Sequence, residues 1–118
     1  MTGSVRPERV AEEFREVLAE EIQRLKDPRV GFVTVTGVDV TPDLRRAVVY
    51  YTVMGEERDR KATRAGLRSA APRLRGELGR QVRLKFLPEL DFREDESAAR
   101  GDRVEELLRE IHEREEGP

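Results

Sequence analysis

Side chains that could carry out catalysis or bind a metal ion are scarce in this chain. His112 is the single histidine, and without any cysteine there is no thiol nucleophile, thiolate metal site or disulfide. The run Glu94-Asp95-Glu96 could hold a hard cation, but consecutive acids do not converge on one ion without a shaped loop, and we expect a solvated loop. Neither the G-x-x-x-x-G-K-[ST] nor the G-x-G-x-x-G phosphate-binding motif occurs. We therefore predict a protein that is not an enzyme, with no catalytic residues, metal, cofactor or small-molecule substrate.

Basic side chains, in contrast, are concentrated in one stretch. Residues 58–85 carry ten basic and two acidic side chains, although the whole chain has a formal net charge of −2. Because Lys and Arg that neutralise phosphates release condensed counterions, this stretch indicates a surface that binds a polyanion. The alternative is a solvated helix face that keeps the protein in solution. The candidate binding residues are Arg64, Arg68, Arg73, Arg75, Arg80, Arg83 and Lys85.

The first half of the chain predicts a helix and two strands. Apolar residues at helical spacing predict a helix over residues 7–26 that ends near Asp27, before a proline that cannot continue it. Residues 30–40 and 45–54 are rich in β-branched and aromatic side chains and predict two strands, which their short connection makes antiparallel. Gly37 lies where the alternation in the first strand changes phase, which indicates a bulge.

Residues 56–80 have helical spacing but contain Pro72 in their interior. A proline there removes a hydrogen bond and clashes with the preceding turn, so we expect two helices, or one kinked helix, broken near residues 69–72. Gly76-Glu77-Leu78-Gly79 fits the GXXG pattern with which KH domains clamp nucleotides, but its glutamate would repel phosphate. We expect instead that Gly79 caps the end of the helix.

One more strand and one more helix are expected beyond this segment. Residues 82–87 alternate apolar and basic side chains up to the last residue, which predicts a third strand that stops at Pro88. The helical connection before it permits parallel pairing with the first strand. After an acidic loop, residues 104–111 predict a short helix, and residues 113–118 are expected to be frayed.

Together these elements predict a single α+β domain over residues 1–118, with an ordered core at about residues 6–112. The expected order is α-β-β-α-α-β with an added C-terminal helix, and the three-stranded mixed sheet is covered by helices on one face. No apolar run approaches the roughly 18 residues of a membrane span, and residues 1–7 lack the apolar core of a secretory signal. We therefore expect a monomeric, cytoplasmic protein that binds no membrane.

Four blocks of sequence follow one another along the chain: residues 9–11 (RVA), 27–38 (DPRVGFVTVTGV), 43–50 (DLRRAVVY) and 87–97 (LPELDFREDES). In this order they resemble the ribosome-binding factor A family, over roughly residues 6–111. The resemblance implies a type II KH-like fold and binding to the small (30S) ribosomal subunit or its precursor during late maturation, with a role in rRNA processing. Combined with the charge pattern, this leads us to expect that the candidate basic residues bind phosphates of small-subunit rRNA.

Members of that family lack GXXG and break a pair of helices at an Ala-x-Gly kink, which the resemblance places at Ala70, Ala71 and Pro72. Proline stands here in place of the family's glycine, and because proline also breaks a helix we expect the kink to remain. The basic stretch straddles this position, so the charge pattern and the resemblance indicate the same surface. The alternative function is a protein-interaction module that binds partner proteins with its basic and acidic surfaces.

Overall fold

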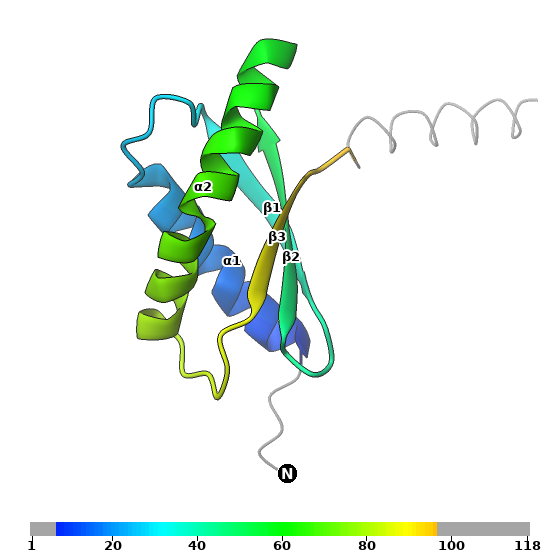
Figure 1. Ribbon diagram of the computed structural model, residues 1–118. Coiled ribbons are helices and arrows are strands. Elements are labelled where there is room, and N and C mark those ends of the chain that lie inside the picture. The colour runs from blue at the N-terminus through cyan, green and yellow to red at the C-terminus, as the bar shows by residue number, and fades with distance from the viewer. Residues whose placement is uncertain (1–6, 97–118) are drawn as a thin grey trace, which may run out of the picture.

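The computed structural model describes residues 7–96. Its elements in chain order are α1 (Pro7–Gln23), β1 (Val33–Val40), β2 (Arg46–Val53), α2 (Glu57–Gln81) and β3 (Glu89–Glu94). The three strands form one mixed sheet with both helices on one face, which confirms the predicted α+β class (Figure 1). The predicted helix at residues 104–111 and the frayed tail at 113–118 lie outside the described residues. Neither of the two described helices is long and apolar enough to cross a membrane.

α1 forms because its apolar side chains recur at four-residue intervals and can all face the sheet. The buried set is Val10, Phe14, Leu18 and Ile22. The helix ends at Gln23, short of the predicted end near Asp27. Its last turn tightens, because the backbone N–H groups of Arg24 and Leu25 donate to carbonyls three residues back, both at 3.1 Å.

β1 and β2 form an antiparallel hairpin that contains the predicted bulge. The register shifts between Val35 and Gly37, and the extra residue lets both Val35 and Val38 face the core. At the turn, Leu44 adopts a left-handed φ of 60° and donates its N–H to the carbonyl of Thr41 at 2.8 Å. The hairpin therefore supplies two strands that both present apolar side chains to the helices.

The third strand is not where the sequence pattern placed it. β3 begins after Pro88 rather than stopping there, and it pairs in parallel with β2 instead of the first strand. Residues 82–87 pair with no strand of the described sheet. Their alternation arises because Val82 and Leu84 pack toward the core while the chain crosses from α2 to the sheet. In β3, Leu90 and Phe92 pack on the core and alternate with charged residues. Because several of these charged residues are acidic, the sequence pattern did not indicate a strand here.

α2 is one helix that runs through Pro72, so the two separate helices allowed by the sequence do not occur, while a kink at Ala70, Ala71 and Pro72 within the single helix stays a prediction. An interior proline removes one backbone N–H donor and costs about 3 kcal/mol. Leu67 and Leu74, on either side of the proline, are buried in the same core and hold both halves of the helix against it. Packing of the long apolar stripe therefore offsets the local cost.

Gly79 lies inside α2 and does not end it, contrary to the prediction. The helix continues to Gln81, and the C-cap residue Val82 donates its N–H to the carbonyl of Leu78 at 2.9 Å. A Cβ atom at position 79 would lie 2.5 Å from Cδ2 of Leu87. The missing side chain at this glycine thus lets the segment before β3 pack closely against the helix.

The segment between α1 and β1 docks on the first half of α2. The buried Thr63 accepts a hydrogen bond from the N–H of Gly31 at 3.2 Å, and its hydroxyl donates to the carbonyl of Arg29 at 3.3 Å. One turn further, a Cβ atom at Gly66 would lie 2.6 Å from Cγ2 of Val30. The helix and this segment approach so closely that position 66 has no room for a side chain.

This contact predicts opposite effects of alanine at two helical glycines. Gly66→Ala should lower the thermal unfolding temperature, because overpacking costs about 1–3 kcal/mol and outweighs the gain in helix propensity. Gly76→Ala is the matched control, since its Cβ atom would meet only the end of Arg80, at 3.8 Å, and it should raise stability by about 0.5–1 kcal/mol. Thermal unfolding followed by circular dichroism compares the two. An equal rise in both variants would contradict the close approach.

A second prediction concerns the proline inside α2. Pro72 is exposed, and alanine there restores the missing backbone donor and removes the ring clash. We therefore expect Pro72→Ala to stabilise the fold by roughly 2 kcal/mol, somewhat less than the propensity difference because proline also restricts the unfolded chain. Denaturant unfolding measures the change. A less stable variant would show that the helix depends on the proline.

Candidate nucleic-acid interface

α2 divides the candidate arginines between two of its sides. Arg64, Arg68 and Arg75 follow one another at intervals of four and seven residues, which places them on one side of the helix. Arg73 and Arg80, seven residues apart, lie on a different side. The structure therefore divides the five candidates on α2 between two sides of the helix and places Arg83 and Lys85 beyond its end, so the seven candidates do not form one uniform patch.

Arg75 is occupied by contacts within the fold. Its Nε donates to the carbonyl of Pro88 at 3.0 Å and its Nη2 to the carbonyl of Leu87 at 2.8 Å. Nη2 also lies 3.6 Å from a carboxylate oxygen of Glu89. The side chain of Arg75 thus links α2 to the segment that leads into β3. This structural role could not be predicted from the position of Arg75 in the basic stretch.

Arg80 is paired more weakly, with Glu77 one turn earlier. Its Nη2 lies 2.8 Å from Oε1 of Glu77, and the arginine side chain is 69% exposed. An exposed ion pair of this kind contributes less than about 1 kcal/mol, so a phosphate can replace the carboxylate. Arg80 therefore remains available to an anionic partner.

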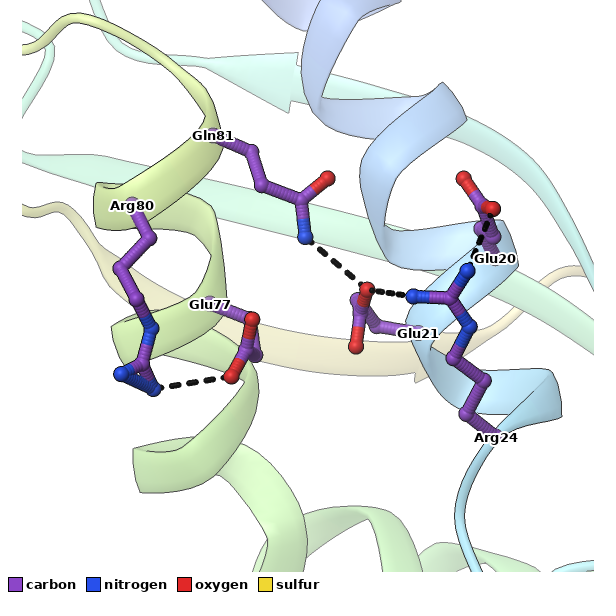
Figure 2. A network of polar contacts seen from close by, with 6 residues as sticks. All are labelled: Glu20, Glu21, Arg24, Glu77, Arg80 and Gln81. Carbon is purple, nitrogen blue, oxygen red and sulfur yellow. Dashed lines mark hydrogen bonds and ion pairs between the residues drawn. The ribbon is translucent and has the colours of Figure 1, made fainter.

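Close to Arg80, a polar network joins the ends of the two helices (Figure 2). Glu21 of α1 is 8% exposed, and its Oε2 accepts hydrogen bonds from Gln81 of α2 and from Arg24, both at 2.9 Å. Arg24 also donates to Glu20 at 2.9 Å. A nearly buried carboxylate of α1 is thereby satisfied by a donor from α2 and by one from the turn after α1, which fixes how the C-terminal end of α2 sits on α1.

Three of the candidate arginines keep their charge free within the described part of the chain. Arg68, Arg73 and Arg83 are exposed, and no carboxylate of residues 7–96 forms an ion pair with them. Unpaired guanidinium groups on a surface favour anionic partners, because their fork matches the oxygens of a phosphate. These residues are the strongest part of the predicted interface.

Arg64 lies beside a buried polar cluster at the far end of the sheet. Tyr51 is buried, and its hydroxyl has no hydrogen-bond partner among the described residues. Burial raises the pKa of the Tyr51 hydroxyl, and the neighbouring guanidinium of Arg64 partly offsets this. Nearby, Nε of Arg60 donates to Oε2 of Glu94 at 2.8 Å, which ties α2 to the end of β3.

The acidic run that could have held a cation does not converge. Glu94 ends β3 on the helix side and pairs with Arg60, whereas Asp95 accepts a hydrogen bond from the hydroxyl of Thr36 at 2.5 Å. Neighbouring strand residues point to opposite faces, so these two carboxylates cannot meet. No group of three potential ligands in residues 7–96 is placed to hold a metal ion, and His112 lies outside the described residues.

One surface feature was missed by the sequence reasoning. Phe86 is 51% exposed, and the Arg45 guanidinium carbon lies 5.0 Å and Lys85 Nζ 5.8 Å from the centre of its ring. A shallow hollow lined by residues 79–85 adjoins it along the chain. A strand at residues 82–87 would place the Phe86 ring on the same, core-facing side as Val82. Because this segment does not form a strand, the ring faces solvent instead.

Comparison with known proteins bears directly on this arrangement. The sequence model of the family described as ribosome-binding factor A matches residues 6–108. A ribosome-binding factor A of Geobacter sulfurreducens is 51% identical over 107 residues, covering 90% of this chain and 91% of its own. The protein of the same description from Anaeromyxobacter sp. (strain K) is 53% identical and covers 100% of this chain and 87% of its own.

Solved structures show the same similarity. The crystal structure of ribosome-binding factor A from Thermus thermophilus has a TM-score of 0.69 and 33% identity, with 76% of this chain and 97% of that chain covered. A homology model of the Thermus thermophilus protein, fitted into a cryo-EM map of its complex with the 30S subunit, has a TM-score of 0.63 and 35% identity, over 73% of this chain and 91% of that chain. Both the sequence and the fold lead to one conclusion: this chain belongs to the ribosome-binding factor A family.

Proposed function

We propose that this chain binds the small (30S) ribosomal subunit or its precursor through small-subunit rRNA, and that it assists late maturation and rRNA processing in the cytoplasm without catalysing a reaction. The observation that carries the proposal is the Thermus thermophilus relative of the same family and fold, which is placed in a complex with the 30S subunit. The match with this chain covers 91% of that relative.

The charge distribution of the structure supports rRNA as the bound component. Within residues 7–96, Arg68, Arg73 and Arg83 form no ion pair, and the partner of Arg80 is the carboxylate of Glu77 in an exposed pair. Phosphate contacts of this kind position a protein on RNA and carry no sequence information by themselves. The basic residues therefore account for affinity, while the choice of rRNA site must come from shape and from contacts with bases.

The first test of this function is sedimentation with ribosomal particles. Tagged protein should travel with free small subunits and their precursors rather than with translating ribosomes, because an assembly factor leaves when the particle matures. Sucrose-gradient fractions probed for the tag at low and moderate salt give the distribution. Protein found only in the soluble fractions, or only on polysomes, would rule out the assembly role.

The second test addresses the free arginines. The double variant Arg68→Ala with Arg73→Ala should bind precursor subunits more weakly and should lower the slope of log affinity against log salt by about one per lost contact. Filter binding at a series of salt concentrations measures both quantities.

A charge-matched control separates local contacts from net charge. Arg9→Ala with Arg93→Ala removes two positive charges from α1 and from β3, outside the helix that carries Arg68 and Arg73. This control should keep the wild-type slope. If both double variants behave alike, the basic residues of α2 are only a solvated face, and salt-insensitive binding would favour the protein-interaction module.

A further inference from the structure

We infer that Phe86, with Arg45 and Lys85 beside it, is a stacking site for one unpaired base of a single-stranded RNA segment. The inference rests on the proposed function and deepens it, since it adds a contact with a base to the phosphate contacts of α2. It also states which form of RNA the site takes: a strand whose base is free of pairing and stacking partners.

The exposure of the Phe86 ring is the first observation. Transferring an aromatic side chain from water to an apolar surface is favourable, so a ring that is 51% exposed keeps unused binding energy. Val82 and Leu84 in the same segment pack toward the core, so the segment had inward positions that Phe86 does not occupy. The ring is therefore exposed to solvent although Val82 and Leu84, earlier in the same segment, pack toward the core.

The charges around the ring identify the chemistry of its partner. Two cations from different parts of the chain lie over the Phe86 ring, with the Arg45 guanidinium carbon at 5.0 Å and Lys85 Nζ at 5.8 Å from the ring centre. The carboxylate of Asp43, two residues before Arg45, accepts hydrogen bonds from the Thr41 hydroxyl and from the backbone N–H of Arg45. An exposed aromatic ring bordered by arginine and lysine suits a nucleotide, whose base stacks on the ring while its phosphates meet the cations.

The fold also holds this ring in place. The carbonyls of Leu87 and Pro88, directly after Phe86, accept hydrogen bonds from Arg75, and Pro88 is fully buried. The carbonyl of Arg45 accepts the N–H of Glu89 at 2.8 Å, so the ring and its guanidinium neighbour belong to two segments joined by a backbone hydrogen bond. A partner that stacks on a preorganised ring loses less entropy than one that must order a mobile loop.

A single strand fits this site better than a duplex. In double-stranded RNA the faces of the bases are covered by their neighbours, whereas unpaired bases can turn outward and stack on an aromatic side chain. Arg83 and Lys85 border the hollow beside the ring and lie within the same short segment, where they can meet the phosphates next to the stacked base. A strand lying along residues 79–86 would therefore contact the protein through one base and its adjacent phosphates.

The test compares two probes that differ only in their bases: a single strand of about ten adenylates, and an abasic strand of the same length. Phe86→Leu should weaken binding of the adenylate strand about tenfold, since stacking of one base contributes roughly 1–3 kcal/mol. It should leave binding of the abasic strand and the salt slope unchanged, because every cation remains. Phe32→Leu is the matched control, since Phe32 is 84% exposed and has no cation over its ring among the described residues.

A second variant reads the stacking directly. The chain has no tryptophan, so Phe86→Trp creates a single reporter, and its fluorescence should be quenched by the adenylate strand but not by the abasic strand. Phe32→Trp should show no such quenching. Wild-type affinity of Phe86→Leu for the adenylate strand, or equal losses on both strands, would overturn the inference. If the wild-type protein binds neither strand and no ribosomal particle, the proposed function itself has failed.

Discussion

Parallel pairing of β3 with β2 is the constraint on which the rest of the fold depends. Parallel neighbours cannot be joined by a tight turn, so the chain must return along the whole length of the sheet before the second strand begins. α2 provides this return with 25 residues, about 37 Å of helix, beside strands of eight residues that span about 26 Å. The helix is therefore longer than the sheet that it covers and projects past it (Figure 1).

The spacing of apolar residues was sufficient to predict the elements that turn one apolar face toward the core. α1, β1 and β2 were predicted, and so was the bulge at Gly37, because each of these segments alternates apolar and polar residues at its own period. β3 could not be found in this way, since two successive segments both alternate and only the one after Pro88 reaches the edge of β2. The continuity of α2 through Pro72 likewise depends on tertiary packing, which outweighs a local preference.

The candidate interface shows a similar division. The sequence located the basic stretch, but it treated Arg75 and Arg68 alike, although Arg75 meets backbone carbonyls that the fold brings to it from beyond the end of the helix. Among the contacts described for these arginines, the ion pair of Glu77 with Arg80 is the one that could be predicted from sequence spacing, because the two residues are three positions apart on a helix. The cations around Phe86 come from two segments that are far apart in the chain, and no pattern in either segment predicts their meeting.

The place of β3 after α2 in the chain also affects the sequence of events in folding. β1 and β2 are neighbours in the chain and can pair as soon as both have been synthesised, with the bulge already fixing their register. β3 joins β2 only after all of α2 has followed, and loop-closure entropy delays such non-local contacts. Until then the outer edge of β2 carries unpaired backbone groups, so a nascent chain is exposed to strand pairing with other chains for as long as the synthesis of α2 and β3 takes.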